Sequence, residues 1–109
     1  MVVECDIKYK KGELLMYVVL VYDIAMDEPE GAKILGRIFK ICKKYLIHIQ
    51  NSVFEGEISE TQLLKLSKEL KRYIRKNKDS VIIFKSRNKK WLDKIFLGKI
   101  EDDATSNFL

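Results

Sequence analysis

The chain has few of the residues on which many active sites depend. Its 109 residues include one histidine, one proline and two cysteines. The single histidine, His48, excludes any mechanism or metal site that needs several imidazoles, and its place in an alternating strand pattern favours a packed side chain. Cys5 and Cys42 lack the spacing of metal ligands, so we expect two free thiols and a reducing cytoplasm. The five glycines are too scattered to form a phosphate-binding loop.

Length and hydropathy also limit the class of protein. A chain of 109 residues forms one domain with one core, and a single proline argues against a disordered chain. The apolar run that begins at Tyr17 is far shorter than a membrane span, and no signal peptide is visible at the start. We therefore expect a cytoplasmic domain without a membrane partner.

The charges are segregated along the chain. Basic residues gather between 33 and 44, between 65 and 78 and between 85 and 94, whereas acids gather at 23–30, 55–60 and 101–103. With a net charge of +5, this pattern is typical of a protein that binds a polyanion. Solvated helix faces explain the same pattern equally well.

Apolar periodicity predicts an alternation of strands and helices. The first expected elements are a strand at 17–23, a helix at 29–45, and two short strands or one kinked hairpin between 45 and 58 that breaks at Asn51-Ser52. A helix from a capping box at Ser59 to about residue 77, a strand at 80–84 and a short strand at Ile95–Leu97 follow. This order is the α+β, ferredoxin-like βαββαβ sandwich with one extra C-terminal strand.

Two features of this fold point to function. The basic side chains of the first helix are spaced four, three and four residues apart, which makes one continuous stripe of Lys33, Arg37, Lys40 and Lys44. Both helices of the fold cover the same face of the sheet, so the other face of the apolar central strands needs a cover. A second copy supplies it most simply, and we expect a homodimer in which the Ile95–Leu97 strand extends the partner's sheet.

A carboxylate, Asp23, ends the first apolar strand. Such an acid is often only a turn former or a helix cap. If a two-fold axis passes near this strand end, however, two copies of Asp23 face each other and hold one Mg²⁺, an ion that polarises phosphodiesters and lowers the pKa of a bound water.

Three segments resemble a known family. They are "MYVVLVYDI" (16–24), "FKICKKY" (39–45) and above all "QNSVFEGEIS" (50–59), and they resemble the small CRISPR-associated endoribonucleases, the dimeric partners of the CRISPR integrase. The resemblance covers residues 16–97 and implies a ferredoxin-like fold that dimerises through its sheets. Residues 1–15 have no counterpart in it, and 98–109 form a polar tail.

The resemblance implies roles for individual residues. Asp23 is the catalytic residue and the metal ligand, one from each subunit, with Tyr22 beside it. Arg37 contacts phosphate, and Ser52 and Phe54 support the site near the interface. The family commonly has an arginine pair after this Asp, whereas "MDEPEGAK" (26–33) has none, so phosphate binding falls to the stripe on the first helix.

The N-terminal extension carries its own hypothesis. Residues 11–13, Lys-Gly-Glu, are encoded by a purine run that resembles a ribosome-binding site, so we expect translation to start at Met16 in the cell. An N-terminal peptide from upstream of Met16 in the native protein would contradict this.

Three functions remain open. The first is a Mg²⁺-dependent endonuclease that acts with the CRISPR integrase in acquiring spacer DNA for antiviral defence, on single-stranded RNA or duplex DNA. The second is a non-catalytic scaffold that binds duplex DNA in the same complex, which the missing arginines favour as the main cellular task. The third is a toxin-type RNase of related fold, which would not need an integrase encoded beside it.

Overall fold

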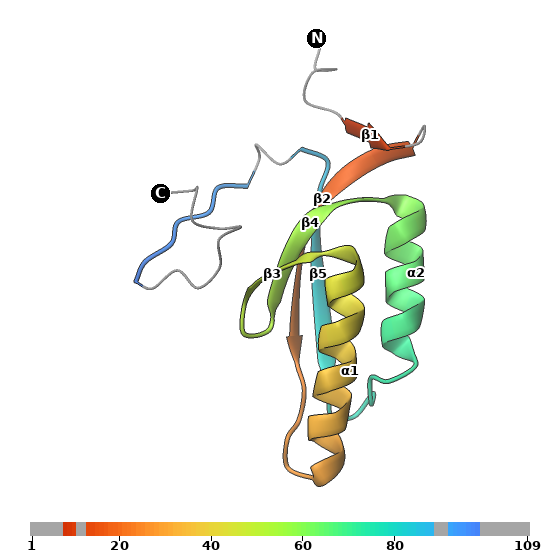
Figure 1. The fold of residues 1–109 in the computed structure, drawn as a ribbon, viewed down its shortest axis with the longest axis vertical. Helices are drawn as coiled ribbons and strands as arrows, with labels where there is room; N and C mark the ends of the chain where they lie inside the picture. Colours follow the sequence, from red (N-terminus) through yellow and green to blue (C-terminus); the bar gives the residue numbers. More distant parts are fainter. Residues whose placement is uncertain (1–7, 11–12, 89–91, 99–109) are drawn as a thin grey trace.

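The computed structural model describes residues 8–10, 13–88 and 92–98. The elements follow the chain in the order β1 (Lys8–Lys10), β2 (Glu13–Asp23), α1 (Pro29–Tyr45), β3 (Ile47–Gln50), β4 (Val53–Ser59), α2 (Glu60–Lys71) and β5 (Ser80–Ser86). From β2 onward this is the predicted βαββαβ order, and both helices lie on one side of the sheet (Figure 1).

The sheet is antiparallel throughout, with β2 between β4 and β5 and with β3 at the outer edge beside β4. The predicted ferredoxin-like fold is therefore confirmed. Sequence periodicity missed β1, which pairs with the first three residues of β2. Because β1 supplies a backbone partner there, β2 begins at Glu13, four residues before the predicted start.

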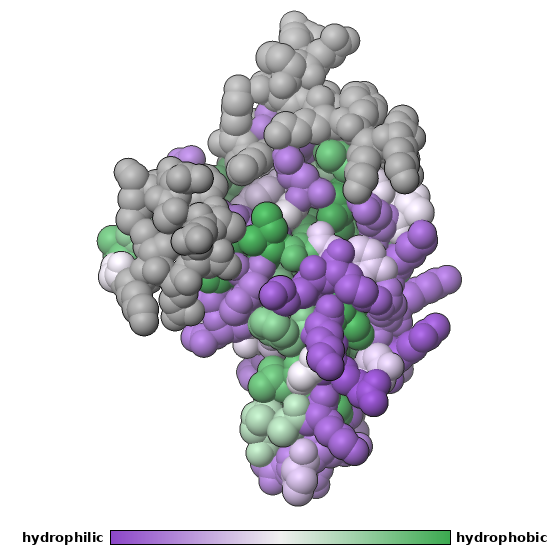
Figure 2. Space-filling model, viewed as in Figure 1, coloured by the Kyte–Doolittle hydropathy of each residue, from purple (hydrophilic) through white to green (hydrophobic). Residues whose placement is uncertain are grey.

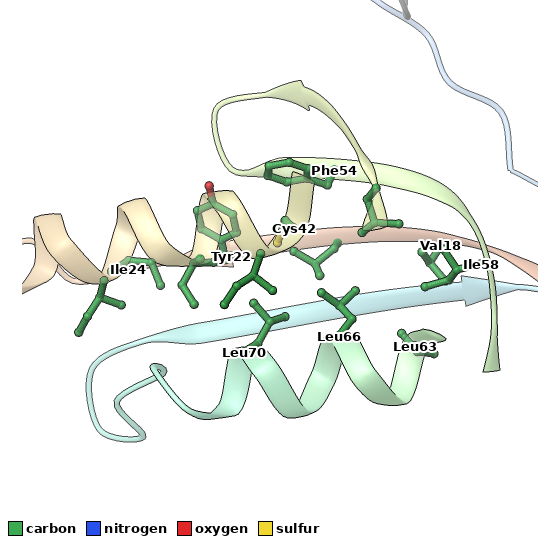
Figure 3. Close-up of a cluster of buried hydrophobic side chains, with 14 residues drawn as sticks. Val18, Tyr22, Ile24, Cys42, Phe54, Ile58, Leu63, Leu66 and Leu70 are labelled. Atoms are coloured by element: carbon green, nitrogen blue, oxygen red, sulfur yellow. The ribbon is translucent and has the colours of Figure 1, made fainter. Parts of the chain in front are cut away.

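Alternate residues of β2 face the helices and form the core. Val18, Leu20 and Tyr22 are buried, and they pack with Phe54 and Ile58 of β4 (Figure 3). The helices contribute Ile34, Ile38, Ile41 and Cys42 from α1 and Leu63, Leu66 and Leu70 from α2. Cys42 is a free thiol whose pKa burial raises to about 12, so it stays protonated in the core.

The β3–β4 hairpin turns at Asn51 and Ser52, as predicted. Asn51 has a φ of 35°, a left-handed conformation that asparagine tolerates better than most residues. The ladder shifts register between His48 and Gln50, and within this strand Ile49 is buried whereas Ile47 is exposed. The alternating pattern predicted around His48 is therefore interrupted by an irregularity in β3. His48 packs edge-on against Phe39, with ring centroids 4.9 Å apart, as a structural side chain.

The second helix starts as predicted and ends early. Ser59 and Gln62 form the capping box, with the Gln62 N–H donating to Ser59 Oγ at 3.2 Å. The helix ends at Lys71, well before residue 77, because Arg75 and Asp79 form a turn of their own. Within the described residues, no helix is long and apolar enough to cross a membrane.

The predicted strand at Ile95–Leu97 is not formed. Residues 92–98 run away from the sheet (Figure 1), and Ile95 is 80% and Leu97 89% exposed. A strand needs a neighbouring backbone with which to pair, and in the single chain this segment has left the sheet. It reaches back through Lys94, whose Nζ donates to Glu55 on β4.

Candidate functional site

Asp23 is the last residue of β2, and its carboxylate is exposed. The register sets it opposite Ser80 of β5, and the preceding N–H, that of Tyr22, donates to the carbonyl of Ser52 at 3.1 Å. Within the described part of the chain, its carboxylate takes part in no hydrogen bond or ion pair. The backbone at Asp23 is thus held on both sides while the carboxylate is left available.

The face on which Asp23 lies is the one that the helices leave open. Residues paired across a ladder share a face, so Asp23 lies on the same side as Ile82 and Phe84, which pair with Val21 and Val19. Ile82 is 52% and Phe84 57% exposed. We call the surface formed by Val19, Val21, Asp23, Ile82 and Phe84 the open face.

Tyr22 and Phe54 lie on the opposite, helix-covered side of the sheet. Their ring centroids are 6.0 Å apart, and Phe39 packs edge-on against Phe54. Phe54 is fully buried and Tyr22 is 4% exposed, so both rings pack within the protomer core. Burial raises the pKa of Tyr22 to about 12, so its phenol is neutral at physiological pH. The two rings therefore belong to the core of one protomer and present little surface to a second subunit.

Ser52, the third supporting residue, lies in the β3–β4 turn. It lines a hollow of about 610 Å³ between this turn and α1, together with Tyr22, Lys40 and Asn51. Lys40 of the basic stripe therefore lines the same hollow as Tyr22 and Ser52, to which the family resemblance gives supporting roles.

The basic stripe is present on α1, where Lys33, Arg37, Lys40 and Lys44 are all exposed. Hydrophilic side chains cover much of the surface over the two helices (Figure 2). The last three residues of the stripe also line a groove of about 210 Å³ between α1 and α2, together with Arg72. Two members have local partners: Lys44 pairs with Glu69, and Arg37 lies 5.1 Å from the ring centroid of Tyr73. Lys33 and Lys40 carry the least compensated charge of the stripe.

A largely buried ion pair near Asp23 was not predicted from the sequence, in which Arg75 is only one of the basic residues between 65 and 78. Arg75 donates from Nε to Asp79 Oδ2 at 2.9 Å and from Nη2 to the carbonyl of Ala25 at 2.8 Å. The Asp79 side chain is fully buried and also accepts the Ala25 N–H at 3.0 Å. The Arg75 hydrogen bonds hold the pKa of Asp79 at about 2. The sequence shows an arginine and an aspartate four residues apart, but no local pattern predicts that both side chains are buried.

The acidic segment at residues 27–30 forms ion pairs with basic residues of the segment between α2 and β5. Lys78 Nζ lies 2.9 Å from Glu28 and 3.5 Å from Asp27, and Arg75 Nη1 lies 3.8 Å from Glu30. The arginine missing from residues 26–33 is thus supplied from a segment about 50 residues later. Its Nε and Nη2 hold the loop by donating to Asp79 and Ala25, whereas its buried Nη1 has no hydrogen-bond partner within the described residues.

Among the described residues of one protomer, no three acidic, histidine or cysteine side chains lie close enough to share a metal ion. Glu55, another carboxylate on the open-face side of β4, is bonded by Tyr17 and Lys94. Asp23 offers the hard oxygen donors that Mg²⁺ prefers. A second copy of the chain would add the same donors from its own Asp23.

Comparison with known proteins identifies the family. The family model described as CRISPR associated protein Cas2 matches residues 16–94. The chain is 54% identical over 101 residues to the CRISPR-associated endoribonuclease Cas2 of Fusobacterium nucleatum, with 93% of each chain covered. It is 41% identical to the CRISPR-associated endoribonuclease Cas2 2 of Moorella thermoacetica, over 84% of this chain and 99% of that protein.

Solved structures agree with this result. A crystal structure of Cas2 superposes with a TM-score of 0.69 at 38% identity, over 80% of this chain and 91% of that one. The crystal structure of Streptococcus pyogenes Cas2 at pH 6.5 superposes with a TM-score of 0.59 at 29% identity, over 62% of this chain and 82% of that one. The chain therefore belongs to the CRISPR-associated protein Cas2 family.

Proposed function

We propose that the protein is a homodimeric, Mg²⁺-dependent endonuclease that acts with the CRISPR integrase in the acquisition of spacer DNA. The observation that carries this proposal is the position of Asp23, an available carboxylate at the end of a strand and on the open, apolar face of the sheet. The endoribonuclease names of its relatives support the same chemistry.

The open face is the surface through which two copies meet. Ile82 and Phe84 expose more than half of their area beside Asp23. Covering a side chain of this size stabilises a complex by roughly 1–2 kcal/mol, and a two-fold axis doubles each contact. Packing through this face brings the two Asp23 residues to the same region.

Metal binding and phosphate binding are assigned to two different surfaces, the open face and the basic stripe on α1. The two Asp23 carboxylates hold Mg²⁺, which when bound polarises a phosphodiester and activates water for its hydrolysis. Lys33, Arg37, Lys40 and Lys44 bind the phosphate backbone without reading its sequence. Single-stranded RNA and duplex DNA both present that backbone, so both belong in the test.

The test measures cleavage of labelled single-stranded RNA and duplex DNA by the purified full-length protein, with Mg²⁺ and with EDTA. Wild type is compared with Asp23→Asn and with Glu60→Gln, which removes an exposed carboxylate at the start of α2. We expect cleavage only with Mg²⁺, its loss in Asp23→Asn, and wild-type activity in Glu60→Gln. Cleavage by Asp23→Asn at the wild-type rate would refute the nuclease site.

A second candidate is a non-catalytic scaffold that holds duplex DNA for the integrase. It is favoured by the engagement of Arg75 with Asp79, which leaves no free arginine on the loop after Asp23, while Lys33 and Lys40 stay exposed. For this function Lys40→Gln weakens duplex binding and lowers its salt dependence by about one phosphate contact. Duplex binding without any cleavage, equal in wild type and Asp23→Asn, would select the scaffold.

A further inference from the structure

The residue two positions after Asp23 is held at both of its backbone polar groups by side chains. The Ala25 N–H donates to Asp79 Oδ1 at 3.0 Å, and the Ala25 carbonyl accepts from Arg75 Nη2 at 2.8 Å. Both side chains come from the segment between α2 and β5. A loop that needed only to connect β2 to α1 would not require two charged partners from so far along the chain.

The pair that holds Ala25 is itself joined by several hydrogen bonds. The Asp79 carboxylate accepts four hydrogen bonds, three from Arg75 through its backbone N, Nε and Nη2 and one from Ala25. Its side chain is fully buried and that of Arg75 is 18% exposed. Because the guanidinium is planar and donates in a fixed fork, it sets the position of Asp79 and of the Ala25 carbonyl together.

The first turn of α1 closes the third side. A Cβ added to Gly31 would lie 2.2 Å from the Ala25 carbonyl oxygen, so only glycine permits this approach. Ala25 therefore lies between the helix start and the Arg75–Asp79 pair, which together we call the Ala25 clamp.

The clamp and the sheet together fix the backbone of Asp23. Ser80, the residue after Asp79, is its partner across the ladder, and the preceding N–H of Tyr22 is bonded to Ser52. The carboxylate of Asp23 is the part that remains available. A site made from one carboxylate of each subunit gains affinity when each is held in place before the ion arrives, because less freedom is lost on binding.

We infer that Arg75 and Asp79 are positioning residues that hold Asp23 for cation binding. This inference rests on the proposed Asp23 metal site. A purely structural clamp would stabilise the fold and leave the affinity for the ion unchanged, so the test must read affinity in protein that is folded.

The test is a titration of the full-length dimer with Mn²⁺, in which free Mn²⁺ is followed by electron paramagnetic resonance. The variants are Asp79→Asn and Arg75→Lys, where lysine keeps the charge but not the fork. Ser59→Ala is the matched control, because it removes the capping box at the other end of α2 and does not touch Ala25. Circular dichroism fixes a temperature at which every variant is folded.

We expect Asp79→Asn and Arg75→Lys to bind Mn²⁺ about tenfold more weakly than wild type, the loss typical when a group that orients a ligand is removed. Ser59→Ala should bind as wild type does. If Asp79→Asn does not fold at any temperature, Arg75→Lys alone decides the result.

Asp23→Asn distinguishes the loss of the metal site from the loss of its positioning residues. If it loses Mn²⁺ while the clamp variants bind as wild type, the metal site stands and the positioning role is refuted. If Asp23→Asn binds Mn²⁺ as tightly as wild type, the metal site itself is refuted and the positioning role falls with it.

Discussion

The two faces of β2 are built from neighbouring residues and behave in opposite ways. On the helix side, Val18, Leu20 and Tyr22 are buried in a core shared with α1, α2 and β4. On the other side, Val19 and Val21 are only partly buried and Asp23 is exposed. One strand thus serves as the centre of a core and as the floor of an open surface. The single chain therefore covers the helix side of β2 completely, whereas it leaves part of the other side exposed to a partner.

The same contrast separates two carboxylates at one end of the sheet. Asp79 is buried and accepts four hydrogen bonds, whereas Asp23, opposite the next residue of the chain, is exposed and available. A buried acid with its hydrogen bonds satisfied holds structure together, and an exposed one that stays available can hold a ligand.

The largest effect should come from a matched pair of phenylalanines, one on each face. Phe54→Ala should lower the free energy of unfolding by about 4 kcal/mol, because it empties a fully buried site. Phe84→Ala removes the same ring from the open face and should lower protomer stability by less than about 1 kcal/mol. Urea unfolding at several protein concentrations checks both values.

The dimer should respond in the reverse order to these two substitutions. We expect Phe84→Ala to weaken self-association at least tenfold in sedimentation equilibrium, at roughly 1.4 kcal/mol per tenfold. An unchanged dimer, or equal unfolding costs for Phe54→Ala and Phe84→Ala, would show that the two faces do not differ as described.

The next effect compares the two carboxylates. Asp79→Asn should lower the free energy of unfolding by about 3 kcal/mol, because it leaves the mostly buried Arg75 without its counter-charge. Asp23→Asn should change it by no more than about 0.5 kcal/mol. Thermal unfolding in EDTA measures both without any contribution from a metal, and similar losses for the two variants would contradict the distinction.

Acid should reveal the Asp79 interaction more directly. Its pKa is about 2 in the folded protein, below the ordinary value, so between these two values the unfolded chain binds more protons than the folded one. The stabilisation is complete above about pH 4 and is lost as the pH falls toward 2, a loss of about 2 kcal/mol. Asp79→Asn should lack this part of the acid dependence. Parallel stability curves for the two proteins from pH 5 to pH 2 would contradict the assignment.

The smallest effect concerns the start of α2, which lies on neither face. Ser59→Ala removes the acceptor of the Gln62 N–H and should lower the free energy of unfolding by about 1 kcal/mol. Urea unfolding measures the change, and Mn²⁺ binding should stay at the wild-type level. A change in Mn²⁺ affinity would show that a general loss of stability is enough to weaken binding at Asp23.

Elements whose signal lies in local periodicity were predicted well. The bounds of α1, the turn at Asn51-Ser52 and the capping box at Ser59 all depend on residues a few positions apart. The helix α2 was predicted too long because its basic residues continue to Lys78, and periodicity does not show that Asp79 captures Arg75. The strand predicted at Ile95–Leu97 is absent from the single chain because a strand needs a neighbouring backbone, and its pairing with a partner's sheet stays a prediction.

In the candidate site, too, the residue with a local signal could be predicted and the contacts between distant residues could not. Asp23 could be singled out because an acid at the end of an apolar run is a local anomaly. The Ala25 clamp joins residues about 50 positions apart, and no local pattern in the sequence indicates that Arg75 bonds to Ala25. The packing of Phe54 inside the protomer likewise depends on Tyr22 and Phe39, which come from two other elements.

One experiment with mixed dimers tests the central claim, that two copies of Asp23 share one ion. Wild type and Asp23→Asn are mixed in equal amounts and allowed to exchange subunits, and bound Mn²⁺ is measured at the concentration that half-saturates wild type. A shared site predicts binding near a quarter of the wild-type level, since about one dimer in four keeps both carboxylates. Binding near one half would contradict it, because each Asp23 would then hold its ion alone.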